Sequence, residues 1–172
     1  LWIGKTGQAN AWYHLYPFVA SKTVKKIDVV RYENPQRNIS SRKINYHLYG
    51  KSSFIVEIWK IFRTGAKVLM HNDVDYIVTF NLVPWGVFGW ILAKIFSKKF
   101  VLGLIGTDFN HYVLNSKTSI FLKFVIRNSN IVFVTGHQMK GDLLKLMPMQ
   151  NIHIFPHCLP KDMIQSRSCS FK

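Results

Sequence analysis

The sequence predicts an α/β fold in which helices cover both faces of a parallel β-sheet. Short apolar runs rich in β-branched residues alternate along the chain with longer stretches of helical periodicity. Continuous apolar strands of this kind are typical of parallel sheets that are buried on both faces. The 172 residues are 48% hydrophobic and 18% charged, a composition that supports one domain with a sizeable core.

The short apolar runs are the predicted strands. YIVTF, FVLGLI and IVFV combine β-branched and aromatic residues, which favour a strand. We expect strands at residues 1–3, 27–32, 44–48, 76–80, 100–105, 131–134 and 152–155. No fixed repeat period accompanies them, which argues against a solenoid and favours a Rossmann-like sheet.

The longer stretches between these runs are the predicted helices. The first spans 9–21, with Pro17 as a kink, and the second begins at Ser52 as its N-cap. Further helices are expected at 84–96, 119–127 and 137–147. The buried face of the second helix is predicted from apolar residues at helical spacing, namely Phe54, Ile58, Ile61, Phe62 and Leu69.

The remaining segments predict loops and a domain boundary. Residues 4–8 form a tight loop, 33–42 a polar loop and 106–110 a loop after a strand. The segment after Pro156 is rich in serine and proline and has little periodicity. We therefore expect one domain at 1–158, and at 159–172 a linker or tail toward a further domain.

The charge of the chain favours an anionic partner. It carries 23 Lys and Arg against 8 Asp and Glu, a formal net charge of +15. Nucleic acid, an anionic membrane surface and phosphorylated substrates all meet this condition. The basic side chains of 37–67, together with Trp59, Trp85 and Trp90, favour the membrane surface, although a solvated face would also carry such charges.

The cysteines, the start of the chain and one apolar segment predict where in the cell the protein lies and whether it crosses a membrane. The two cysteines, Cys158 and Cys169, form no disulfide framework, and no signal peptide opens the chain. Residues 82–96 are apolar but too short to span a bilayer, so we expect a buried or interfacial helix. The predicted location is cytoplasmic, with peripheral contact at the inner membrane face.

Polar residues follow three predicted strands and indicate a ligand cleft. Asn81 ends one strand, Gly106 to Asn110 (GTDFN) follow the next, and Thr135, Gly136 and His137 follow a third. Ligand sites in open parallel sheets gather outside the carboxyl ends of the strands. Asp108 is expected to bind a sugar hydroxyl or act as a base, or else simply to cap the turn that follows.

The segment GKTGQ, from Gly4 through Gly7 to Gln8, lies between a predicted strand and a predicted helix. Small residues there would let backbone N–H groups approach an anion at the helix N-terminus, and a plain tight turn explains them equally well. A P-loop would place the strand residues 1–3 inside the phosphate loop, so that interpretation is rejected. No metal site is expected, since the histidines show no ligand spacing.

The runs DYIVTFNLVPWGVFGWILAKIFSKKFVLGLIGTDFN and NSNIVFVTGHQMKGDLLKLMPMQNIHIFPHCLP resemble the N-terminal domain of GT-B glycosyltransferases of the retaining group 1 (family 4-like) kind. The resemblance covers nearly all of 1–160 and depends on the order and spacing of elements. It implies the acceptor-side half of a two-domain enzyme. Such an enzyme transfers a sugar from a nucleotide-sugar donor to a lipid-linked or polysaccharide acceptor, with no cofactor or obligatory metal.

The resemblance also implies roles for single residues. Gly4 and Gly7, with Gln8 after them, match the loop that faces the donor diphosphate. Asp108 matches the acidic, catalytic residue of an HGSD-like loop, with Gly106 and Thr107 beside it as binding residues. Gly136 and His137 match a Ser-Glu-like pair, and Asn81 belongs to the same binding edge.

Three departures from the family pattern keep a second hypothesis open. Ile105 replaces the His of the HGSD-like loop, Gly136 and His137 replace the usual pair, and His157 and Cys158 stand where an Asn-Gly is usual. A non-catalytic binding module, or a partner-dependent subunit of a glycosyltransferase, would tolerate these changes. A nucleic-acid-binding domain ranks last, because no recognition helix or RNP-like strand is present.

Overall fold

The computed structural model describes residues 1–4, 8–33, 41–114 and 119–155. Within these residues, seven strands form one sheet in the order β3-β2-β1-β4-β5-β6-β7, and each neighbouring pair is parallel. The predicted parallel α/β fold is therefore confirmed. The strands are β1 (Trp2–Ile3), β2 (Ile27–Arg31), β3 (Ile44–Leu48), β4 (Tyr76–Phe80), β5 (Lys99–Leu104), β6 (Ile131–Val134) and β7 (Ile152–Ile154).

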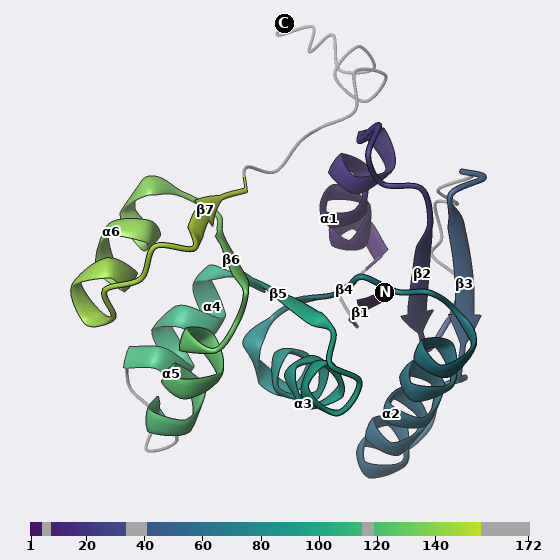
Figure 1. The fold of residues 1–172 in the computed structure, drawn as a ribbon. Helices are drawn as coiled ribbons and strands as arrows, with labels where there is room; N and C mark the ends of the chain where they lie inside the picture. Colours follow the sequence, from purple (N-terminus) through teal and green to yellow (C-terminus); the bar gives the residue numbers. More distant parts are fainter. Residues whose placement is uncertain (5–7, 34–40, 115–118, 156–172) are drawn as a thin grey trace, which may run out of the picture.

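Helices cover both faces of this sheet, as predicted. α1 lies on one side, and α2, α3 and α5 lie on the other (Figure 1). Strand side chains alternate between the two faces, so Ile3 packs with the larger helical layer and Trp2 with α1. The main helices are α1 (Gln8–Ala20), α2 (Phe54–His71), α3 (Val87–Ile95), α5 (Ser119–Arg127) and α6 (His137–Leu146).

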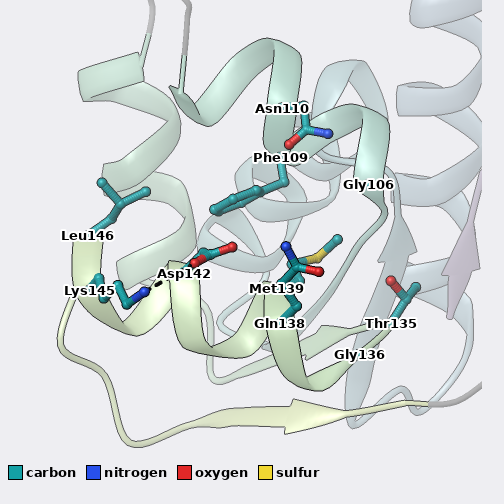
Figure 2. A pocket seen from close by; sticks show the side chains of 10 residues that line it. All are labelled: Gly106, Phe109, Asn110, Thr135, Gly136, Gln138, Met139, Asp142, Lys145 and Leu146. Atoms are coloured by element: carbon teal, nitrogen blue, oxygen red, sulfur yellow. Dashed lines mark ion pairs between the residues drawn. The ribbon is translucent and has the colours of Figure 1, made fainter.

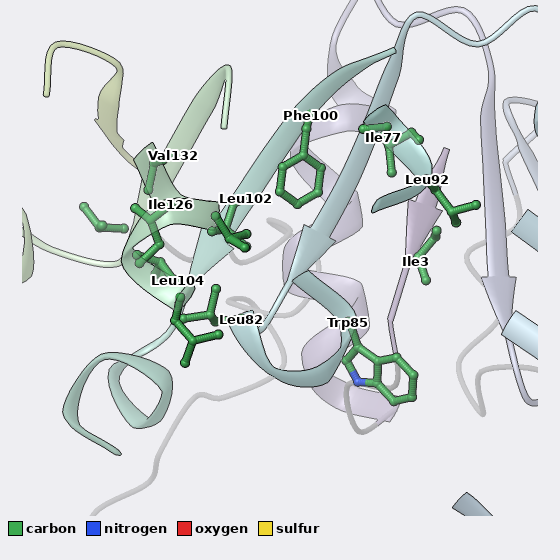
Figure 3. Packing of buried hydrophobic residues seen from close by; sticks show 14 of the residues in the cluster. Ile3, Ile77, Leu82, Trp85, Leu92, Phe100, Leu102, Leu104, Ile126 and Val132 are labelled. Carbon is green, nitrogen blue, oxygen red and sulfur yellow. The ribbon is translucent and has the colours of Figure 1, made fainter. Parts of the chain in front are cut away.

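The main core lies between the sheet and the layer that contains α2, α3, α5 and α6. Figure 3 shows Phe100 and Leu102 of β5 among side chains from the helical layer, and all the residues labelled there are buried. Burying side chains of this size contributes about 1.5–3 kcal/mol each. The apolar composition of β5, β6 and α3 is therefore explained by packing.

The apolar segment around Pro84 differs in detail from the predicted helix over 84–96. A short π-helical segment, η1 (Leu82–Gly86), precedes α3, and Val83 inside it has extended dihedral angles. Leu82, Trp85 and Leu92 are buried, so of the two predicted alternatives, a buried or an interfacial helix, the buried one is correct. The burial of Trp85 also means that, contrary to the prediction, this side chain does not support a membrane-facing surface. In the described part of the chain, no helix has both the length and the apolar character needed to cross a bilayer.

Three local predictions are wrong. Residues 106–110 are helical and not a loop, because α4 (Gly106–Asp108) continues into η2 (Phe109–Leu114). The N-cap of α2 is Ser53, and its side chain makes no capping hydrogen bond. Phe54 is 61% exposed and does not belong to the buried face, because it lies in the first turn of α2, at the edge of the layer.

Candidate functional site

The ends of four neighbouring strands define the candidate site. β1, β4, β5 and β6 are parallel neighbours, with Ile3 paired to Thr79, Phe80 to Gly103 and Leu104 to Val134. Their carboxyl ends therefore lie along one edge of the sheet. The residues that follow them lie along this edge, namely Gly4, Asn81, Gly106 and Gly136; the sequence predicts this placement for the last three.

A hollow of about 650 Å³ lies at this edge, between the α4–η2 segment and α6. Its volume is in the range of small-molecule sites. Figure 2 shows its ten lining residues around the open space. Gly106, Thr135 and Gly136 come from the predicted edge; the others are Phe109, Asn110, Gln138, Met139, Asp142, Lys145 and Leu146.

The first turn of α6 forms one wall of the hollow. Gly136 is the N-cap, has extended dihedral angles and provides no side-chain capping bond. The first N–H groups of any helix lack intrahelical acceptors and carry partial positive charge. In the next turns, Asp142 forms an ion pair with Lys145 at 3.6 Å (Figure 2). The wall therefore offers hydrogen-bond donors and acceptors beside the apolar side chains of Phe109 and Met139.

Asp108 lies in the α4 turn but does not line the hollow. Its side chain is 3% exposed, and its Oδ2 atom accepts a hydrogen bond from the Leu82 backbone N–H at 3.0 Å. Burial raises the pKa of the carboxyl group to about 6, although hydrogen bonds from the Leu82 and Ile105 backbones act in the opposite direction. In this arrangement Asp108 ties the segment after β5 to the segment after β4; its predicted catalytic role stays a prediction.

Asn81, at the end of β4, has a strained backbone. Its φ of 78° lies in a region that residues other than glycine seldom adopt. The conformation is held from both sides, because Asn81 N donates to Gly103 O at 3.0 Å and Asn81 O accepts from Gly86 N at 2.9 Å. Its Oδ1 atom is buried and has no hydrogen-bond partner among the described residues. Strain and an unpaired acceptor of this kind are common at functional sites.

The remaining predicted residues that the structure describes follow β1 or lie in α1, α4 and α6. Gly4 follows β1, and a Cβ atom there would approach the Trp2 ring to 3.0 Å, which explains the glycine by packing. Gln8 begins α1, and Thr107 lies within α4. His137 is the exposed first residue of α6 and is absent from the hollow's lining. Gly7 lies outside the described residues.

Sequence reasoning missed the α6 wall of the hollow. Gln138, Asp142 and Leu146 recur every four residues, and Met139 precedes Asp142 by three, which places them on one face of a helix. That spacing, directly after Gly136, was the signal that could have identified them. Phe109 and Asn110 had no such signal, because their placement depends on the helical turn that replaces the predicted loop.

A second hollow of about 700 Å³ lies on the α1 face. Its lining includes the first residues of β2 and β4, from Lys26 to Asp28 and from Asp73 to Tyr76. It therefore reaches the amino ends of the strands, whereas ligands of open parallel sheets bind outside the carboxyl ends. The topology therefore favours the hollow beside α6 as the ligand site. Across the described residues, no cluster of three or more His, Cys, Asp and Glu side chains is arranged to hold a metal ion.

Comparison with known proteins adds no family assignment. No protein-family model matches the chain, and no curated protein matches it significantly. The resemblance to GT-B glycosyltransferases therefore depends on the order and spacing of its own elements.

Proposed function

We propose that this chain is the acceptor-side domain of a GT-B glycosyltransferase, which transfers a sugar from a nucleotide-sugar donor to a lipid-linked or polysaccharide acceptor. The observation that carries the proposal is the hollow at the carboxyl edge, bounded by Gly106 and by the uncapped first turn of α6. Sugars present hydroxyl groups on one side and C–H groups on the other. A wall that combines polar groups with Phe109 and Met139 matches this character.

In the proposed reaction, the acceptor hydroxyl oxygen bonds to the anomeric carbon of the donor sugar. The bond from that carbon to the diphosphate breaks, and the hydroxyl proton passes to a base. By the resemblance, the donor binds to a second domain that faces this edge. Backbone N–H groups at the carboxyl edge would stabilise the negative charge that develops on the leaving diphosphate. Asp108 would act by positioning the segments on which the acceptor lies.

A second candidate is a non-catalytic glycan-binding module. The burial of Asp108 and its hydrogen bond to Leu82 favour it, because a carboxylate committed to the backbone is not exposed to a reacting hydroxyl. Both candidate functions use the hollow as the glycan site, but only the enzyme forms a new glycosidic bond there.

The test uses the protein expressed from its native reading frame. We expect it to transfer sugar from one member of a panel of nucleotide-sugars to a lipid-linked or polysaccharide acceptor, measured by release of the nucleotide. Gly106→Leu should reduce transfer at least about tenfold. A Cβ atom added at Gly106 meets no atom within 4 Å, and Gly106 lines the hollow, so we expect the leucine to project into the hollow without disturbing the fold.

Gly141→Leu is the matched control. Gly141 lies in α6, outside the hollow's lining, and a Cβ atom added there also meets nothing within 4 Å. It should retain full transfer. If no donor supports transfer but glycans bind to the protein and Gly106→Leu abolishes that binding, the binding module replaces the enzyme as the conclusion. Equal activity of the two variants would show that the hollow is not the acceptor site.

A further inference from the structure

Large apolar side chains are exposed on the outer surface of the helical layer. Ile55 and Trp59 on α2 are 79% and 64% exposed, and Ile120 on α5 is 82% exposed. Ile55 and Trp59 are four residues apart, so they lie on the same face of α2. Exposed apolar groups of this size indicate an interaction surface.

An aromatic cluster continues this surface from α3 to α5. The Trp90 ring packs edge-on against Phe121 and Phe124, with centroids 6.4 and 5.7 Å apart. Both phenylalanines are exposed. The Lys94 ammonium lies over the Trp90 ring at 5.9 Å from its centroid. Aromatic rings with a cation above them suit the boundary between an apolar phase and water.

The exposed charges of the same three helices have one sign. α2, α3 and α5, all within the described part of the chain, contain six basic residues: Lys60, Arg63, Lys67, Lys94, Lys123 and Arg127. Glu57 is the one carboxylate in these helices. It is buried and accepts a hydrogen bond from the Tyr49 hydroxyl at 3.3 Å. The outer surface of these helices therefore offers cations without exposed carboxylates.

The topology places part of this surface toward the same edge of the sheet as the hollow. Each helix between parallel strands runs back against the strand direction, so its first turn lies near the carboxyl edge of the sheet. Ile55 and Ile120 occupy the first turns of α2 and α5. The most exposed apolar side chains thus lie at the edge that also holds the candidate site.

We propose that this surface, defined by the exposed residues of α2, α3 and α5, docks on an anionic lipid bilayer. The isoleucines and aromatic rings would enter the interface, and the lysines and arginines would lie against headgroup phosphates. Nucleic acid is disfavoured as the occupant, because phosphate contacts need the cations but not the aliphatic side chains. The inference does not depend on sugar transfer, since lipid docking is measured without a donor.

The experiment is co-sedimentation of the full protein with vesicles of phosphatidylcholine alone or mixed with phosphatidylglycerol. We expect binding to the mixed vesicles, weakening with added salt, and little binding to the neutral ones. Trp59 fluorescence provides a second readout, because an exposed indole shifts to shorter wavelength when it enters the interface. Trp59→Phe should remove most of that shift.

Two double variants test separately the apolar and the basic side chains of the proposed surface. The double variant Ile55→Ser and Ile120→Ser should weaken vesicle binding about tenfold or more, and Arg63→Glu with Lys67→Glu should do the same. Leu48→Ser and Leu144→Ser are the matched controls, because both leucines are exposed but lie on β3 and α6. They should bind as the unmodified protein does. Circular dichroism and thermal unfolding confirm that each variant is folded.

Three results would overturn the proposal: equal binding to neutral and anionic vesicles, vesicle binding that the serine variant retains, or no vesicle binding together with salt-sensitive binding to nucleic acid. The last result would assign the basic surface to nucleic acid. Loss of vesicle binding with transfer to a soluble acceptor intact would leave the proposed function standing, so the two proposals fail separately.

Discussion

At the scale of single residues, Asp108 shows how the fold changes the chemistry of a side chain. A carboxyl group in a Gly-Thr-Asp sequence is ordinarily solvated, but here it is buried and accepts the Leu82 N–H. Its pKa is raised from 3.8 to about 6 by burial. The carboxyl group therefore binds its proton more tightly in the folded than in the unfolded protein.

This shift predicts a pH dependence of stability. A raised carboxyl pKa stabilises the folded state below the unfolded pKa, and that contribution is lost as the pH rises through about 6. The unfolding free energy of the protein, minus that of Asp108→Asn, should therefore fall between about pH 4 and pH 7 by up to about 3 kcal/mol. Urea unfolding of both proteins across this range measures the difference.

The matched control for the loss of one carboxylate is Asp142→Asn, because the side chain of Asp142 is 42% exposed. If the difference in unfolding free energy between the protein and Asp108→Asn does not change with pH, the raised pKa of Asp108 is contradicted. The comparison is informative even if Asp108→Asn is less stable at every pH, because the prediction concerns the change with pH and not the absolute value.

At the scale of elements, glycines set how closely helices approach the sheet. A Cβ atom at Gly89 of α3 would lie 2.4 Å from Thr79 Cγ2 and 3.0 Å from Phe100 Cε2. Thr79 is fully buried and Phe100 nearly so, so neither side chain can turn toward solvent. The glycine is therefore a packing requirement of the α3–β4 contact.

Gly89→Ala should destabilise the protein by about 1–3 kcal/mol, although alanine favours a helix by about 1 kcal/mol over glycine. Gly141→Ala in α6 meets nothing within 4 Å and should stabilise it by about 0.5–1 kcal/mol. Thermal unfolding measures the stability of each variant relative to the unmodified protein. Adding Thr79→Ser to Gly89→Ala deletes the clashing methyl group and should recover part of the loss. Equal effects at Gly89 and Gly141 would refute close α3–sheet packing.

Element boundaries were predicted well where packing follows the local pattern. β3, β4, β6 and α5 have the predicted bounds; β4 and β6 are continuous apolar runs and α5 is an amphipathic helix, so local pattern and packing agree there. The segment 106–114 was missed, since Gly-Thr-Asp-Phe-Asn consists largely of turn-forming residues. Its helical conformation is accompanied by tertiary contacts, including the bond from Leu82 to Asp108 and the burial of Phe109 and Val113.

At the scale of the whole molecule, the two edge strands of the sheet are less buried than the strands between them. Five of the six residues of β5 are buried, whereas β3 and β7 lie at the two sheet edges and each has one buried residue. We expect backbone amides of β4 and β5 to exchange with solvent at least about a hundredfold more slowly than those of β3 and β7, because their opening requires global unfolding. Hydrogen–deuterium exchange measures this. Comparable protection in β7 would show that the β7 edge is covered by something else.

The sequence by itself determined the parallel α/β fold, since apolar runs without alternation are stable only when both faces of a sheet are covered. It also determined that Asn81, Gly106 and Gly136 share one edge, because the ends of parallel strands coincide. Only the tertiary structure decided which of them line a hollow, that Asp108 is buried outside its lining, and that α6 completes its wall. These features depend on distances between segments far apart in the chain, and no local pattern of residues encodes such distances.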